Sequence, residues 1–243
     1  MRAFLTIWRR EMAACFFSPV AYVTMVAFLL ISGATFVVGV VRNVGTSETI
    51  PSLLFGSAIL WLTLLITVIS MRLFAEERRS GTLEALMTAP VTERQVVLGK
   101  YAGALSFLLI ASAPMVGNAF VLSFLIPGAP AIDFGAMAGG SIILALISAF
   151  CLSIGLLVSL MTRNQIIAAI CSFCAIWFVL LFGWLMSALP FGLEGLADYL
   201  SAMNHIEDFV RGSIDTRPLV LYVSGTVFTL FLSVRVLESR RWI

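Results

Sequence analysis

Charged residues are scarce in this chain of 243 residues, since only 12% of them are Asp, Glu, Lys or Arg. Soluble domains contain about 25%. Hydrophobic residues make up 60% of the chain even before its 18 glycines are added. Disorder is excluded because too few residues are polar, and a soluble domain of this length could not bury so much apolar surface. The composition therefore predicts a membrane protein.

Histidine, on which many active sites depend, occurs only once, at His205. A Ser–His protease therefore lacks its base, and neither the zinc motif HExxH nor the phosphate-binding loop GxxxxGK[ST] occurs in the sequence. The net charge of +2 is too small to indicate nucleic-acid binding. We expect no catalytic residue, cofactor site or metal site in this chain.

Cysteine is also uncommon, with four residues in the whole chain. Cys171 and Cys174 form a C-x-x-C pair, a spacing typical of metal and redox sites in soluble proteins. Here the pair lies in the apolar run ICSFCAIWFVLLF, with no histidine or carboxylate nearby. We interpret both cysteines as small packing residues.

Six apolar runs are long enough to cross a bilayer as helices, which takes about 20 residues each. The predicted spans are 20–41, 52–71, 101–126, 134–161, 166–190 and 219–237. The predicted fold is an all-α integral membrane protein with six transmembrane helices, formed by a single domain over 1–243.

The distribution of basic residues predicts the orientation, because cytoplasmic loops are enriched in Lys and Arg. The N-terminus, the 72–100 loop, the 162–165 turn and the C-terminal tail hold all but three of the 15 basic residues. The exceptions are Arg42, Arg211 and Arg217 on the opposite side, which also holds most acidic residues outside the 72–100 loop. Both termini are therefore expected in the cytoplasm.

The segment 1–19 is predicted to be a helix lying in the inner membrane interface. Phe4, Trp8, Met12 and Phe16 recur every four residues, while the arginines fall mainly on other faces. Such a helix would turn its aromatic face toward the lipid and its arginines toward anionic headgroups. A disordered basic tail is the alternative, and Ser18-Pro19 would end either segment.

The predicted spans contain a single ionisable residue, Arg235, close to an inner end where its side chain can reach water. Proton-driven transporters rely on titratable groups inside the membrane, and none is available here. Sodium coupling through backbone carbonyls is the alternative, although no matched pair of Gly/Pro-broken segments indicates it. Energy from another polypeptide is therefore favoured for any uphill transport. Pro114 and Asn118 lie in mid-span as candidates for the pathway or for helix packing, and Gly135-x-x-x-Gly139 has close-packing spacing.

The cytoplasmic segment 72–100 is predicted to form two short helical pieces. The second span continues inward as a charged helix until Ser80-Gly81 interrupts it. A second piece of about two turns follows over 82–89 and ends at Pro90. Thr92 and Gln95 then form a capping box that begins the next helix. An apolar stripe on the 82–89 piece favours docking to a partner, and a connector folded back on the bundle is the alternative.

These cytoplasmic residues resemble a known family. The stretch FAEERRSGTLE at 74–84, then APVT at 89–92 and VLGK at 97–100, is similar to the type-2 ABC exporter permeases. Residues 209–215 (FVRGSID) and 237–242 (LESRRW) also resemble the gliding-motility GldF-like subgroup. The resemblance extends over the whole chain.

The resemblance implies that this loop is a coupling element that docks into a separate ATPase subunit. The expected coupling residues are Glu76, Glu77, Arg78, Gly81, Thr82, Leu83, Glu84, Leu86 and Pro90. Leu83 and Leu86 would fill the groove of the ATPase, and Glu77, Arg78 and Glu84 would make contacts at its rim. Lys100 matches the lysine that opens the third span of the family.

The resemblance also implies partners and a location. A pair of ABC ATPase subunits would bind ATP and Mg²⁺, and a second permease copy or a related permease would complete the pathway. The subgroup adds an accessory membrane protein with a periplasmic domain. The expected location is the bacterial cytoplasmic (inner) membrane, where the lipid bilayer surrounds the spans.

The outer segment 191–217 is predicted to contain one helix over 192–212. Leu193, Leu196, Leu200, Met203, Ile206 and Val210 share its apolar face, and Gly212 is a plausible C-cap. We expect His205 at the level of the headgroups rather than at a metal. In the family this region dips into the outer leaflet and helps to close the exit.

Three function classes remain. An ATP-driven exporter permease is favoured over an uptake permease, because Glu84-Ala-Leu-Met departs from the importer loop pattern of the family. A membrane anchor or scaffold, driven by the same ATPase without a transported substrate, is the second class. A channel is the third, although no span resembles a selectivity filter.

Overall fold

The computed structural model describes residues 2–43, 49–82, 91–125, 133–188, 194–213 and 215–239, and nearly all of them are helical. The helices are α1 (Arg2–Phe16), α2 (Pro19–Arg42), α3 (Ile50–Leu73), α4 (Ala75–Ser80), α6 (Glu93–Leu125), α7 (Phe134–Met161), α8 (Gln165–Ala188), α9 (Glu194–Leu200), α10 (Ala202–Val210) and α11 (Thr216–Ser239). The described residues include no strand. The all-α prediction is confirmed.

Six of these helices are long and apolar enough to cross a membrane: α2, α3, α6, α7, α8 and α11. Each overlaps one predicted span, and α7 has the predicted bounds. Helix α6 begins at Glu93, where the predicted capping box begins it, and runs on into the span predicted from residue 101. The Thr92 N–H donates to Gln95 Oε1 at 3.2 Å, and the Gln95 N–H donates to Thr92 Oγ1 at 3.4 Å.

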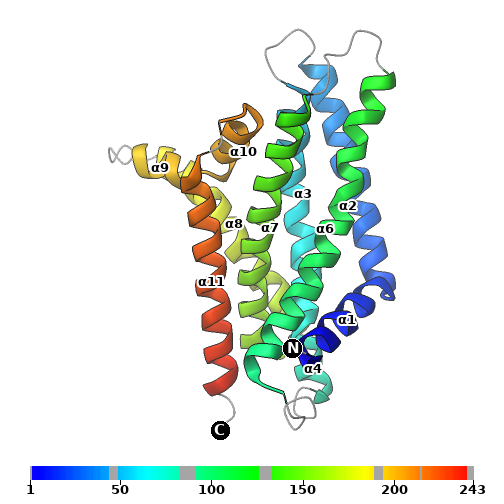
Figure 1. Cartoon of the computed structure of the whole chain (residues 1–243), viewed down its shortest axis with the longest axis vertical. Helices are drawn as coiled ribbons and strands as arrows, with labels where there is room; N and C mark the ends of the chain where they lie inside the picture. The colour runs from blue at the N-terminus through cyan, green and yellow to red at the C-terminus, as the bar shows by residue number, and fades with distance from the viewer. Residues whose placement is uncertain are drawn as a thin grey trace.

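Helices α3 and α7 form the centre of the bundle (Figure 1). About half of each span is buried, 56% for α3 and 50% for α7, against 17% for α2. The exposed residues of the outer helices are mostly apolar, as expected for surfaces that face lipid. The start of α1 and the end of α11 lie toward the same end of the bundle (Figure 1), as the distribution of basic residues predicts.

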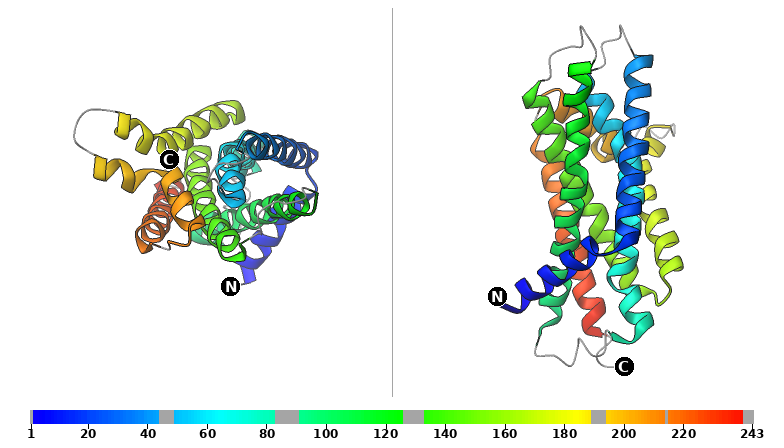
Figure 2. Two further views of the ribbon diagram at one scale, coloured as in Figure 1. Left: turned by 90° about the horizontal axis from the view of Figure 1, so that it is seen from above. Right: turned by 90° about the vertical axis from the view of Figure 1, so that its right-hand side faces the viewer.

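Helix α1 lies across the lower part of the bundle (Figure 2) and packs on α6. The Trp8 indole Nε1 donates to Ser106 Oγ at 3.1 Å, and the Phe16 ring meets the Phe107 ring edge-on at 5.1 Å between centroids. The prediction that this stripe turns toward lipid is therefore wrong. An apolar stripe suits a protein surface as well as a lipid one, and Gly99 and Gly103 of α6 let α1 approach closely.

The C-x-x-C pair lies on the outer surface of α8. Cys171 and Cys174 are both exposed free thiols, so the prediction that they are packing residues within this chain is wrong. Residues three apart share one face of a helix, and this face also exposes Ile170 and Phe178. It points away from the core of the chain.

The outer segment forms two helices instead of the single predicted one. The chain breaks at Ser201, whose side chain caps α10 by accepting the Asn204 N–H at 3.4 Å. A β-carbon at Gly183 of α8 would lie only 2.6 Å from the Ser201 backbone, so α8 needs glycine here to meet the break. Gly212 has φ +82° just after α10, which agrees with the predicted cap.

His205 lies inside the protein, between α10 and α11. Its side chain is buried, and Nδ1 lies 2.9 Å from the Tyr222 hydroxyl. Burial lowers the pKa of His205 below its ordinary value of 6.5, although Asp208 and Asp215 partly oppose this change. His205 is enclosed because the apolar face of α10 packs on α7 and α3. Its expected depth, at the level of the headgroups, stays a prediction.

The lowered pKa of His205 predicts a loss of stability in acid. Below about pH 6.5 the unfolded chain takes up a proton that the folded chain resists, so stability is present above this pH and is lost as the pH falls. The apparent melting temperature should therefore fall between about pH 7.5 and about pH 5.5. His205→Gln keeps a polar side chain beside Tyr222 but does not titrate, so its melting temperature should fall less. Equal losses in both proteins would contradict this role.

Candidate functional site

The helix of the second span breaks at Phe74, where the cytoplasmic loop begins. Phe74 has φ −129° and ψ −34°, outside the helical range, so α4 leaves in a new direction. The N–H groups of Phe74 and Ala75 donate to Ser159 Oγ of α7 at 3.2 and 3.1 Å. Because Ser159 satisfies donors that the break sets free, α7 stabilises the direction in which α4 leaves the membrane.

Removing this acceptor is expected to destabilise the break. Ser159→Ala would leave two buried N–H groups without their partner, at a cost of about 1–3 kcal/mol in the free energy of unfolding. Ser172 is a control, because it is equally buried but its hydroxyl donates only to the Ala169 carbonyl of its own helix. Ser172→Ala should change the free energy by less than Ser159→Ala, as measured by SDS titration in mixed micelles. Equal effects would contradict the role of Ser159.

A cluster of four charged side chains holds α4 against α1 and α6. Lys100 Nζ of α6 lies 2.8 Å from Glu11 Oε1 of α1 and 2.9 Å from Glu77 Oε1 of α4. Arg10 Nη2 lies 3.0 and 3.1 Å from the same two oxygens. We call Arg10, Glu11, Glu77 and Lys100 the inner joint. Its two cations and two carboxylates balance in charge and join three helices.

The inner joint is largely shielded from water. The Lys100 side chain is 1% exposed, and those of Glu11 and Glu77 are 12% and 19% exposed. The ammonium group also lies 5.2 Å from the centroid of the fully buried Phe74 ring, a favourable position for a cation. Phe74, at which the helix breaks, therefore also stabilises the Lys100 ammonium group through its ring.

Two further bonds attach this region to other helices. The Arg72 Nε lies 2.9 Å from Glu76 Oε2, and the Arg72 guanidinium also donates to Ser18 Oγ at the start of α2. Arg78 Nη1 donates to the Leu160 carbonyl at the end of α7, at 2.6 Å. Side chains of α4 therefore contact α1, α6 and α7. Next to α4, the Arg72 side chain also joins the end of α3 to the start of α2.

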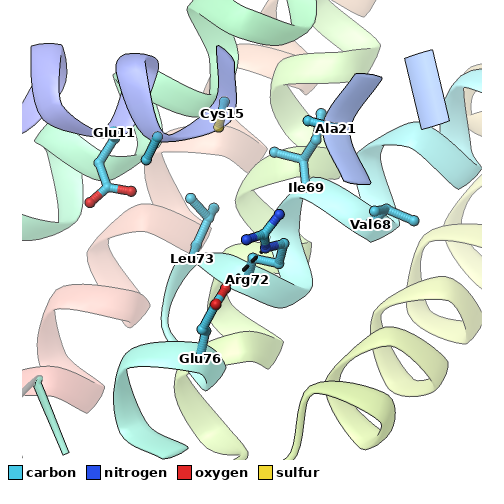
Figure 3. Close-up of a pocket in the computed structure, with 9 residues that line it drawn as sticks. Glu11, Cys15, Ala21, Val68, Ile69, Arg72, Leu73 and Glu76 are labelled. Carbon is cyan, nitrogen blue, oxygen red and sulfur yellow. Dashed lines mark hydrogen bonds and ion pairs between the residues drawn. The ribbon is translucent and has the colours of Figure 1, made fainter. Parts of the chain in front are cut away.

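A small cavity separates α1, α2 and α3 above this region, lined by Glu11, Cys15, Arg72 and Glu76 among others (Figure 3). Its volume of about 80 Å³ is far below the roughly 300 Å³ of the smallest ordinary ligand sites. Burial raises the pKa of the Cys15 thiol to about 11, with a smaller contribution from Glu11. The cavity therefore fits neither a nucleotide nor a reactive thiolate. Among the described residues, no group of three His, Cys, Asp or Glu could hold a metal ion.

The structure describes five of the nine predicted coupling residues. Glu76, Glu77 and Arg78 lie on α4, Gly81 ends it with φ +73°, and Thr82 follows. The break predicted at Ser80-Gly81 is thus present, in addition to the one at Phe74. The remaining predicted coupling residues lie outside the described residues: Leu83, Glu84, Leu86 and Pro90.

The two pathway candidates lie on α6. Helix α6 continues through Pro114, whose ring is exposed on the surface of the chain. Asn118 is half-buried, and a β-carbon at Gly33 of α2 would lie 3.4 Å from its Nδ2. Asn118 therefore lies at the contact between α2 and α6.

Sequence reasoning missed the internal partners of the loop. Glu77 and Arg78, expected at the rim of a partner, are bonded within the chain. The ion pair between Glu11 and Lys100 was not predicted, because the two residues are 89 positions apart in the sequence. One signal was available, because Glu11 is the only acidic residue in α1 and lies on its apolar face.

A comparison with protein families matches residues 16–233 to the ABC-2 family transporter proteins. The chain is a member of the ABC-2 transporter family. It is accordingly a multi-pass membrane protein and the transmembrane permease subunit of an ABC transporter, which is not itself catalytic. A comparison with curated proteins gave no match. The match to the ABC-2 family includes α4 and Lys100 but begins at the last residue of α1, so Glu11 lies before it.

Proposed function

We propose that this ABC-2 permease is the membrane subunit of an ATP-driven exporter in a bacterial cytoplasmic membrane. A separate pair of ATPase subunits would bind ATP and Mg²⁺, and residues 76–90 would dock on that pair. The observation that supports this proposal is the inner joint. It bonds α4, the first part of the docking segment, to α1 and α6 by buried ionic contacts.

The joint supplies a physical route from the ATPase to the spans. Because Glu77 is bonded to Lys100 and Arg78 to the Leu160 carbonyl, α4 cannot shift without disturbing α6 and α7. Packed, hydrogen-bonded elements move as units rather than deforming continuously. Closure of the ATPase pair would therefore tilt these helices together. Pro114 and Asn118, the proposed pathway residues, lie farther along the same α6 helix.

The proposed exporter contains two permease subunits, either two copies of this chain or this chain and a related permease. Helix α8 presents an apolar face that the chain itself leaves uncovered, including Ile166, Ile170 and Phe178, which are 59–69% exposed. Such a face can pack on a second permease as well as on lipid. Export is favoured over uptake by the loop pattern at 84–87.

Within the family, we place the chain near the gliding-motility GldF-like subgroup on the basis of residues 209–215 and 237–242. This placement includes an accessory membrane protein with a periplasmic domain as a partner. Reading the neighbouring open reading frames tests it. An adjacent ATPase supports the exporter, and an adjacent membrane protein with a periplasmic domain supports the subgroup.

The docking proposal predicts a large loss of ATPase binding when two leucines become charged. The double substitution Leu83→Asp with Leu86→Asp would put two carboxylates where an apolar groove is expected, so the ATPase should no longer co-purify. Unpaired buried charges at an interface are strongly unfavourable. The matched control, Leu83→Met with Leu86→Met, keeps both positions apolar and should retain the ATPase. Unchanged ATPase recovery with the double Asp variant, correctly inserted, would rule out docking through this segment.

A further inference from the structure

A second cavity lies in the outer half of the bundle, where α9 and α10 pack beside α3 and α8. Its volume is about 390 Å³, within the range of roughly 300–1,000 Å³ that is typical of small-molecule sites. Figure 1 shows α9 and α10 beside the outer end of α8 and far from α4, which carries Glu77 of the inner joint. This cavity is therefore separate from the coupling region.

Among the described residues that line this cavity, α3 and α8 supply mainly apolar side chains, and its polar end is formed by α9 and α10. Ile59, Leu60 and Leu180 from α3 and α8 supply apolar walls, and Asp198 and Asn204 from α9 and α10 supply polar groups. Leu60, Leu181 and Met203, which also line it, are 40–44% exposed. The cavity therefore opens on the surface of a span, where a molecule from the outer leaflet could enter.

Asp198 provides a negative charge at the polar end. Its Oδ1 accepts a hydrogen bond from Asn204 Nδ2 at 3.2 Å. The described arginines of the outer segment are engaged elsewhere, Arg211 with Glu207 and Arg217 with Asp215. Over the part of the chain that the structure describes, no Lys or Arg forms an ion pair with Asp198.

The Trp177 side chain forms part of the wall of the same cavity. Its indole Nε1 is enclosed by protein atoms, so Trp177 contributes an aromatic surface and not a polar group. The position of Trp177 in the wall also makes it a fluorescent reporter of binding.

We propose that this cavity binds a cationic amphiphile, a molecule with one apolar chain and an amine at its end. The chain would lie between α3 and α8, and the protonated amine would bind the Asp198 carboxylate. A carboxylic acid of the same length would be repelled by Asp198 and by the acidic residues nearby on α9 and α10. Binding of the amphiphile does not require the ATPase. Its transport as a substrate would rest on the proposed function.

Tryptophan quenching tests the proposal on the purified permease alone, in nanodiscs of phosphatidylcholine. 12-Bromododecylamine is the probe, and 12-bromododecanoic acid is the matched control. The other four tryptophans will give a background of non-saturable quenching with both probes. Above this background we expect a saturable component with the amine, which the Trp177→Phe variant reduces and the acid lacks. Asp198→Asn should weaken amine binding about fivefold, the size expected for one partly exposed ion pair. Asp208→Asn removes the same charge from an exposed position outside the cavity and should leave binding nearly unchanged.

Several results would overturn the proposal. Equal quenching by amine and acid would show ordinary lipid contact, and equal effects of the two Asp variants would exclude a specific role for Asp198. An absence of saturable quenching would show that the cavity does not admit the amine, for example because a second permease covers it. Because no ATPase is present, failure here leaves the docking proposal standing, and failure of docking leaves this result standing.

Discussion

Replacing Lys100 with methionine should lower the free energy of unfolding by about 3–5 kcal/mol, the usual cost of removing one partner from a buried ion pair. The variant leaves the Glu11 and Glu77 carboxylates with Arg10 alone, whose side chain is 51% exposed. The two carboxylates would then repel one another in largely buried surroundings. Equilibrium SDS titration in mixed micelles measures this loss.

Two further variants show whether the destabilisation by Lys100→Met arises from the inner joint or merely from removing a positive charge. Arg94→Met removes an exposed cation from the same helix and should change the free energy by no more than about 0.5 kcal/mol. Adding Glu77→Gln to Lys100→Met should recover part of the loss, because it removes one of the stranded charges. If Lys100→Met is as mild as Arg94→Met, the joint does not stabilise the cytoplasmic end.

Gly139→Val should separate α10 from α7. A β-carbon at Gly139 would lie 2.5 Å from the Phe209 carbonyl oxygen, and no side-chain rotation can relieve a clash with backbone. Phe209 and Ile206 are both buried in this contact region, so α10 must shift as a unit. We expect a loss of about 3 kcal/mol, at the upper end for overpacking. Hydrogen exchange should show reduced protection of the amides in α10.

Gly117 provides the matched control for this substitution. It also lies within a membrane-spanning helix, but a β-carbon there meets no other atom within 4 Å. Gly117→Val should therefore leave the exchange of α10 unchanged and alter stability by no more than about 1 kcal/mol. If both valines act alike, the effect arises from helix propensity and not from the contact with Phe209.

The six spans could be predicted from the sequence because each is a local property. A run of apolar residues specifies a membrane helix without reference to its neighbours. The predicted start of α7 agrees with the structure, in which Asp133 is the N-cap. The capping box at Thr92 and Gln95 could be recognised for the same reason. Such signals depend on residues only a few positions apart.

The inner joint could not be predicted, because its bonds connect residues far apart in the sequence. Lys100 is separated from Glu11 by 89 positions, and sequence periodicity gives no information on pairing over such distances. Lys100 also fell outside the predicted span, which began at Tyr101. In the structure it lies inside α6, and α1 and α4 supply its partners.

The surface that an apolar helix face contacts also could not be predicted from the sequence. Helical spacing shows that residues share a face, but a lipid tail and an apolar side chain attract that face almost equally. The stripe of α1 therefore packs on α6, while the face of Cys171 and Cys174 is exposed. The burial of His205 was not predicted, because the break at Ser201 that orients α10 involves the close approach of Gly183 from α8.

The central claim is that residues 76–90 receive the force of ATP hydrolysis from a separate ATPase. Photo-crosslinking measures this contact directly, with p-benzoylphenylalanine in place of Leu86 and, as a control, in place of the outer Tyr199. We predict a covalent adduct between the permease and the ATPase from position 86 and none from position 199. An intact complex that gives no adduct from position 86 would contradict the claim.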